Sequence, residues 1–154
     1  MQLSEFLDFD AIKPAMPSAN KRGLQQHLAQ LSGQRTGLDS NEILSSLVER
    51  ERLGSTGFGH GVAIPHGKVE GLKQIYCLFA RLPEAIDYQA IDGERVDLVF
   101  LLLSPPDAGA EHLKALAAVS RVVRHVPTLE KMRGARSRDA LAAVLIGADE
   151  RDAA

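Results

Sequence analysis

A histidine between proline and glycine is the residue best suited to chemistry in this chain. His66 ends the pattern AIPH within the segment GSTGFGHGVAIPHG, which runs from Gly54 to Gly67. A neutral imidazole is a good nucleophile, and with an ordinary pKa of about 6.5 most such side chains are uncharged at pH 7. Pro65 fixes the backbone before the ring, and Gly67 is expected to leave its far side open. The pattern predicts a histidine that attacks phosphorus, although a histidine in this setting equally well caps a turn.

The glycines before this histidine do not form a nucleotide-binding loop. Gly61 and Gly67 are separated by five residues, and Lys68 is not followed by serine or threonine, so the phosphate-binding loop pattern is absent. Gly57, Gly59 and Gly61 are evenly spaced and lead into the apolar stretch VAI, whereas a dinucleotide fingerprint leads into a helix. We therefore expect backbone turns with positive φ, or close approach of another chain segment, followed by a short strand anchored in a sheet.

Metal and redox chemistry are not predicted. His60 and His66 are six residues apart, which fits neither one helix face nor a tight chelating turn, and no third ligand stands nearby in the sequence. The single cysteine, Cys77, lies in the apolar run IYCLF and is expected to be a buried thiol. We expect neither a metal nor another cofactor.

Length and composition indicate one compact domain that spans residues 1–154. The chain is 45% hydrophobic and 25% charged, which is enough to build a full core. No stretch is long and apolar enough to span a bilayer, and the first residues carry acid rather than base, so a cytoplasmic protein without membrane insertion is expected. A formal net charge of -2 and the absence of tryptophan argue against a nucleic-acid binder.

Helical and strand-like patterns alternate along the chain. This order predicts an α/β fold, mixed α+β by some schemes, with three layers around a central mixed β-sheet. Helices are predicted over residues 21–31, 39–53, 107–125 and 137–146, and central strands over residues 74–82 and 96–103.

Glycine, proline and apolar spacing set the expected helix ends and faces. Gly33 and Gly37 are expected to end the first helix, Pro127 to bound the third, and Gly147 to end the last. The third helix is expected to bury one stripe of side chains. Its predicted members are Leu113, Leu116, Ala117, Ser120 and Val123.

Three segments together resemble a known family. The run RERLGSTGFGHGVAIPHGK, from Arg50 to Lys68, closely resembles the active-site segment of the phosphotransferase-system enzyme IIA domains of the fructose, mannitol and nitrogen-regulatory type. The segments 90–103 and 111–113 are similar to later landmarks of that family. The resemblance covers most of the chain and implies a single EIIA type-2 domain. His60 and Phe58 depart from the usual asparagine and isoleucine, which leaves the docking preference open.

The resemblance implies three site residues. His66 matches the phosphorylated histidine, which reacts through Nε2, while Arg50 matches the active-site arginine and His112 the second active-site histidine. Arg50 has donors for phosphoryl oxygens, and its alternative role is a cation at a helix C-terminus. His112 falls in the first turn of a helix, where the macrodipole favours a neutral ring and free amides favour an anion. Its alternative role is an exposed polar side chain beside Glu111.

The resemblance also implies partners. A small HPr-like or NPr-like phosphocarrier protein is expected to deliver the phosphoryl group, with Phe58, Val62 and Val69 as candidate contacts. We favour the nitrogen-regulatory branch, whose targets include potassium transporters and sensor kinases. The first alternative is a free-standing sugar IIA that passes phosphate to a IIB unit. An alternative of another class is a non-catalytic interaction module like the cytoplasmic domains of anion transporters.

Basic residues gather toward the C-terminus of the sequence. Acidic residues interleave with them, so a solvated surface is expected, with contact to an acidic partner as the alternative. The set comprises Arg121, Arg124, Lys131, Arg133, Arg136 and Arg138.

Overall fold

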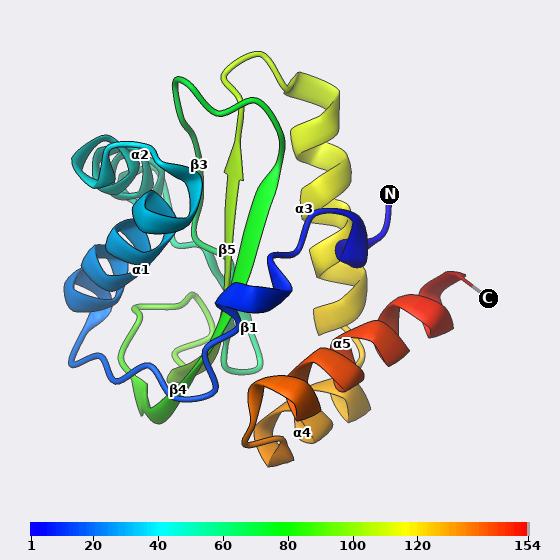
Figure 1. Ribbon diagram of the computed structural model, residues 1–154. Helices are drawn as coiled ribbons and strands as arrows, with labels where there is room; N and C mark the ends of the chain where they lie inside the picture. The colour runs from blue at the N-terminus through cyan, green and yellow to red at the C-terminus, as the bar shows by residue number, and fades with distance from the viewer. Residues whose placement is uncertain (154) are drawn as a thin grey trace.

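The computed structural model, which describes residues 1–153, has helices on both faces of a mixed sheet. Helices α1 and α2 cover one face, and α3, α4 and α5 cover the other (Figure 1). This arrangement confirms the predicted three-layer α/β fold. The helices are α1 (Lys21–Thr36), α2 (Ser40–Arg52), α3 (Gly109–Val123), α4 (Val126–Gly134) and α5 (Arg138–Ala153), preceded by the short 3-10 turns η1 (Leu3–Glu5) and η2 (Phe9–Ala11).

The sheet is built around one long strand, β5. Its other strands are β1 (Gly57–Gly59), β2 (Val62–Ala63), β3 (His66–Lys68) and β4 (Tyr76–Ile86), and β5 itself is Val96–Ser104. Strands β2 and β3 lie one after the other along one edge of β5, both parallel to it, and β4 is antiparallel on the opposite edge. Strand β1 extends the sheet as a hairpin with β2.

Strand β5 separates two apolar cores. Because successive side chains of a strand point to opposite faces, Leu98, Phe100 and Leu102 pack with α3, α4 and α5, whereas Val99 and Leu101 pack with α1 and α2. The prediction of a strand that is apolar on both faces is confirmed for β5.

Strand β4 differs from the expected central strand. It pairs with another strand on one edge only, and its other edge is covered by the N-terminal segment through bridges of Leu7 to Cys77 and of Lys13 to Ala80. It also continues beyond Leu82 to Ile86 and so includes Pro83. Proline is tolerated there because an edge strand does not need every amide for the ladder.

Two glycines expected to end helices lie inside them. Helix α1 continues through Gly33 and ends before Gly37, whose φ of 76° suits the C-cap position. A Cβ on Gly33 would lie 3.1 Å from Ser40, so this glycine lets the start of α2 approach α1. Helix α5 likewise continues past Gly147.

The region after α3 contains a helix that the sequence patterns did not reveal. Helix α3 ends at Val123, as the position of Pro127 suggested, but Pro127 then lies in the first turn of α4. A missing amide costs nothing in a first turn, so proline here starts a helix rather than marking a loop.

The buried stripe of α3 matches the prediction at Val123, which is buried, and in part at Leu116, which packs against the core, but its other members differ. Leu113 is 66% exposed, and the helix instead buries small and β-branched residues against the sheet. The pattern of alanine and valine keeps helical spacing over two turns and allows close packing, whereas the prediction gave more weight to the size of leucine. The buried residues are Ala115, Ala118, Val119, Val122 and Val123.

Candidate active site

The three predicted site residues meet at one end of the sheet. His66 begins β3, Arg50 lies in the last turn of α2, and His112 lies in the first turn of α3. Nε of Arg50 lies 3.1 Å from Nε2 of His66, and the centroids of the two imidazole rings are 5.5 Å apart. All three side chains line one open cavity of about 590 Å³, together with Lys68 and Leu53.

Tight packing between β3 and α2 sets the position of His66. The strand is in register with the end of β5, with His66 opposite Leu102. On its other side, Ser46 of α2 donates a hydrogen bond to the carbonyl of Lys68 at 2.8 Å. A Cβ on Gly67 would clash with Oγ of Ser46. Gly67 therefore permits close approach of the helix, and it also lines the cavity beside His66.

Hydrogen bonds fix the tautomer of His66. Nδ1 lies 2.7 Å from the carbonyl oxygen of Ile64, which can only accept, so Nδ1 carries the proton. Nε2 then has a lone pair, which accepts the Nε–H of Arg50. Burial lowers the pKa of His66, and the charge of Arg50 lowers it further against the opposing effects of the Ile64 carbonyl and Glu51. The ring is therefore neutral at pH 7, with its unprotonated nitrogen on the side of Arg50.

Arg50 makes two contacts, one for each of the roles considered for it. Its Nη1 donates to the carbonyl of Gly54 at 2.9 Å, just beyond the end of α2, while Nε reaches His66. The first contact satisfies a free carbonyl near the helix C-terminus, as a cation at that position does. The second places a guanidinium beside the imidazole in the cavity, where it is available to an anion.

His112 is held by a serine that sequence reasoning missed. Nδ1 of His112 lies 2.5 Å from Oγ of Ser104, the last residue of β5. Burial, followed by the charges at His66, Lys68 and Arg50, lowers the pKa of His112 to about 4. The expected neutral ring is thus confirmed in direction, but burial and neighbouring cations are its main causes. A lone serine at the end of the run VDLVFLLLS was the available signal for Ser104.

The first turn of α3 has no side-chain cap. Ala108 occupies the N-cap position and provides no hydrogen-bonding side chain to the amides that follow. The positive end of this helix therefore lies beside His112 without a side-chain cap, although the acidic Glu111 in the same turn partly offsets it.

His60 and Phe58 lie away from this cavity. His60 and Gly61 form the two-residue turn between β1 and β2, with φ values of 55° and 80° that suit a type I′ turn. Gly61 accepts hydrogen bonds from the beginning of β5, whereas His66 lies at its far end. The amide of His60 donates to Asp92, and its carbonyl accepts from Arg133. These two departures from the family pattern are therefore not beside His66.

The rim of the cavity differs from the predicted one. Val62 and Val69 are buried, and Phe58 packs partly against the core that contains α3, so none of the three forms an exposed rim. Instead, Leu53 is 79% exposed at the cavity edge, and Leu113 is exposed next to His112. Exposed leucines beside a polar cavity are typical of a protein-binding surface.

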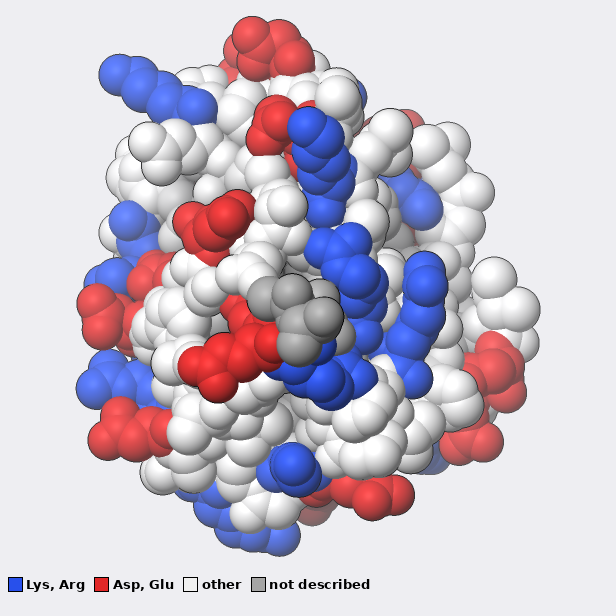
Figure 2. All heavy atoms as spheres, turned by 90° about the vertical axis from the view of Figure 1, so that its right-hand side faces the viewer, with Lys and Arg blue, Asp and Glu red and all other residues white. Residues whose placement is uncertain are grey.

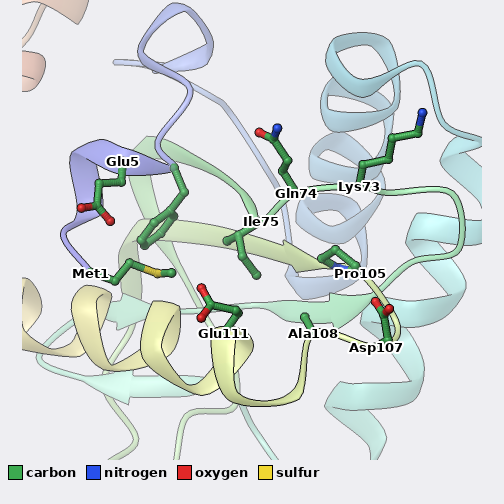
Figure 3. Close-up of a pocket in the computed structure, with 10 residues that line it drawn as sticks. Met1, Glu5, Lys73, Gln74, Ile75, Pro105, Asp107, Ala108 and Glu111 are labelled. Atoms are coloured by element: carbon green, nitrogen blue, oxygen red, sulfur yellow. The ribbon is translucent and has the colours of Figure 1, made fainter.

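A second cavity lies beside the same helix end but contains none of the three site residues. Its volume is about 380 Å³, and it lies between the N-terminal segment, residues 73–75 and the start of α3. Figure 3 shows Met1 and Ile75 at its centre and Glu111 pointing toward it from α3.

Other parts of the surface give no sign of a further reactive centre. Within residues 1–153, no group of three or more histidine, cysteine, aspartate or glutamate side chains is placed to hold a metal ion, and none of the helices there is long and apolar enough to cross a membrane. Cys77 is fully buried, which raises the pKa of its thiol. Figure 2 shows lysine and arginine beside acidic side chains on the face of α3 and α5, and Arg133 is paired with Asp97.

Comparison with known proteins places this geometry in a family. Residues 5–147 match the family model described as "Phosphoenolpyruvate-dependent sugar phosphotransferase system, EIIA 2". The chain is 43% identical over 145 residues to a nitrogen regulatory protein of Bradyrhizobium diazoefficiens, covering 94% of this chain and 95% of that one. It is 33% identical to a fructose-specific EIIA component of Haloferax volcanii, covering 93% of this chain and 94% of that one.

A solved structure agrees with both the fold and the relationship. The nitrogen regulatory protein IIA-Ntr from Neisseria meningitidis superposes with a TM-score of 0.87 at 34% identity, covering 93% of this chain and 98% of that one. The family match spans nearly the whole chain, from η1 to the middle of α5. On these grounds the chain belongs to the EIIA type-2 family of the phosphotransferase system.

Proposed function

We propose that this chain is a phosphocarrier in which His66 accepts a phosphoryl group from a phosphohistidine carrier protein. The observation that carries the proposal is the orientation of the imidazole. Its Nδ1 proton is bound to the Ile64 carbonyl, so the lone pair of Nε2 is directed to an open cavity that also contains Arg50 and His112. A neutral nucleophile beside cationic and neutral donors suits phosphoryl transfer.

The transfer exchanges one phosphorus–nitrogen bond for another. Nε2 of His66 attacks phosphorus in line, the new Nε2–P bond forms, and the P–N bond of the carrier breaks with its electron pair returning to the carrier's ring. The proton on Nδ1 stays at the Ile64 carbonyl. No proton has to leave His66 for the bond to form.

Arg50 and His112 bind the transferred group in this proposal. The guanidinium moves from the lone pair of His66 to the phosphoryl oxygens, where its forked donors match the developing charge. Ser104 donates its hydroxyl proton to Nδ1 of His112, so the ring proton is on Nε2 and free to donate to a phosphoryl oxygen. The uncapped start of α3 adds favourable partial charge beside them.

The carrier docks over the exposed leucines. Leu53 lies at the cavity edge, and Leu113 is exposed beside His112 in the sequence. In this proposal both become buried by an apolar patch that surrounds the phosphohistidine of an HPr-like or NPr-like protein. The phosphate adds roughly two negative charges to this surface, by analogy with other phosphorylated side chains. Phosphorylation thereby changes which partners the same surface accepts.

We place the chain in the nitrogen-regulatory branch, acting in the cytoplasm as one EIIA unit over residues 1–154. The support is the similarity, over 94% of this chain, to a relative named nitrogen regulatory protein. Potassium transporters and sensor kinases are the kinds of target this branch implies. The fructose-specific relative supports a second candidate, a sugar IIA that passes phosphate to a IIB unit.

Labelled phosphoenolpyruvate tests the proposal. The purified chain, incubated with the upstream phosphotransferase enzyme and the carrier, is expected to take up acid-labile label, and the His66→Ala variant is expected to take up none. His27→Ala, which changes a histidine on α1, is the matched control and should label normally. Label on the His66→Ala variant contradicts the proposed role, and an unlabelled wild-type chain favours the interaction-module alternative. Efficient onward transfer to a IIB domain favours the sugar branch.

A further inference from the structure

Glu51 is a buried carboxylate directly beside Arg50 in the sequence, and every contact it makes is polar. Its side chain is 8% exposed. Oε2 accepts hydrogen bonds from Nζ of Lys21 at 3.1 Å and from the amide of Thr56 at 2.9 Å. Oε1 accepts from the hydroxyl groups of Thr56 and Tyr88. One carboxylate thus joins α1, α2, the loop before β1 and the segment after β4.

A short chain of hydrogen bonds leads from this carboxylate to the imidazole. Thr56 is held by Glu51 through both its amide and its hydroxyl group. The carbonyl of Thr56 accepts the amide of Ile64 at 2.9 Å, and the carbonyl of Ile64 accepts Nδ1–H of His66 at 2.7 Å. The group that fixes the tautomer of His66 is therefore itself positioned by Glu51.

The carboxylate is also a negative charge close enough to act on the His66 ring. Burial by itself raises the pKa of Glu51, but the hydrogen bonds from Thr56 and Lys21 outweigh burial and lower it, so the group is ionised. Its charge in turn raises the pKa of His66. When Nε2 bonds to phosphorus while Nδ1 keeps its proton, the ring gains positive charge, which a buried anion stabilises.

We propose that Glu51 is a positioning residue for phosphoryl transfer, which holds the Ile64 carbonyl against Nδ1 and so aims the lone pair of Nε2 into the cavity. Because Glu51 and Arg50 are adjacent at the end of α2, the same helix turn fixes both the guanidinium and the loop that supports the imidazole. The proposal rests on the proposed function of His66 as phosphoryl acceptor.

The test compares two variants of the same network. Glu51→Gln keeps the size of the side chain but removes its charge. The amide NH2 group that replaces one oxygen then faces groups of Lys21, Thr56 or Tyr88 that are themselves donors. Tyr88→Phe removes the hydroxyl that bonds both Glu51 and Thr56, yet it leaves the charge and the link between Glu51 and Thr56 in place. Glu42→Gln, on the exposed first turn of α2, controls for loss of a glutamate on the same helix.

Two measurements are made on each variant: the single-turnover rate from the phosphorylated carrier at saturation, and the ¹⁵N spectrum of the His66 ring during a pH titration. For Glu51→Gln we expect transfer to slow by about tenfold, which corresponds to ~1.4 kcal/mol in the barrier. We also expect a lower pKa of His66 and a ring spectrum that moves away from the single Nδ1–H tautomer. Tyr88→Phe and Glu42→Gln should keep the wild-type ring spectrum and transfer at close to the wild-type rate.

The outcomes separate positioning from plain structural support. A wild-type rate and an unchanged His66 spectrum in Glu51→Gln overturn the proposal. The proposal is also overturned if Tyr88→Phe slows transfer as well and the slowing in each variant is proportional to its loss of melting temperature. If Glu51→Gln does not fold, Thr56→Val replaces it, because it removes one bond to the carboxylate and should shift the ring spectrum in the same direction but less. If the wild-type chain takes no phosphate, the proposed function fails, and the His66 spectra alone decide the positioning role.

Discussion

Arg50 donates its Nε–H to Nε2 of His66 across 3.1 Å, so the guanidinium occupies the lone pair that the imidazole needs to attack phosphorus. In this structure the guanidinium and the imidazole are hydrogen-bonded to each other, so the lone pair of Nε2 already has a partner. In the proposed transfer, a phosphoryl group would offer the guanidinium stronger, charge-assisted partners and so release the lone pair.

Replacing Arg50 with alanine should slow phosphorylation of His66 by about a hundredfold, the usual effect of removing one donor to developing charge. The pKa of His66 should rise at the same time, because the charge of Arg50 lowers it in the native protein. Single-turnover labelling and an NMR titration of the ring measure the two effects. Arg52→Ala, an exposed neighbour paired with Glu49, is the control. Wild-type kinetics for Arg50→Ala would remove this residue from the site.

Stability should fall as the pH drops below 6.5, and His112 should contribute to the fall. The pKa of His112 is about 4 in the folded chain and about 6.5 when unfolded, so between these values the unfolded state binds more protons. The contribution of His112 is therefore complete above pH 6.5 and is lost as pH falls toward 4. Urea denaturation at pH 7.0, 5.5 and 4.5 measures it. His112→Gln should flatten the dependence, and an equal slope in both proteins would contradict the assignment.

Gly67→Ala should destabilise the fold by about 1–3 kcal/mol, the typical cost of overpacking, because the added methyl group clashes with Ser46 of α2. Ser46→Ala removes the nearest atom, Oγ, and should recover part of the loss in the double variant. A double-mutant cycle of urea denaturation measures the coupling between the two positions. Strictly additive changes in the free energy of unfolding would show that the side chains at positions 67 and 46 do not interact.

Leu53→Asp should weaken docking of the phosphorylated carrier without weakening the fold, since the side chain is 79% exposed. The expected change is a higher KM for the carrier with an unchanged rate at saturation. Ile91→Asp is the matched control, because Ile91 is 90% exposed and lies next to Asp92, which contacts the distant turn at His60. Equal effects of the two variants would argue against a docking surface at Leu53.

Local sequence patterns predicted most of the long elements and the candidate nucleophile, but not helix α4. The periodicity of apolar residues predicted α2, β5 and the third helix, and Asp39 signalled the start of α2, where its side chain accepts from the amide of Asn41. The segment around His66 pointed to a nucleophile, and the resemblance added Arg50 and His112. The helix and strand predictions depend on the types and spacing of residues that are close together in the sequence.

The tertiary structure alone decided how these residues act. Contacts between distant segments decide three features. The missing side chain of Gly67 lets α2 approach β3, Leu113 faces solvent, and Ser104 contacts His112. The role inferred for Glu51 is of the same kind, because its partners Lys21, Thr56 and Tyr88 come from three separate parts of the chain. The spacing of residues in a sequence indicates which side chains share one face of a helix or strand. It does not indicate which atoms from distant segments those side chains contact. For that reason the sequence pointed to the candidate nucleophile, whereas only the folded chain showed its tautomer, the lowering of its pKa and the contact of its lone pair with Arg50.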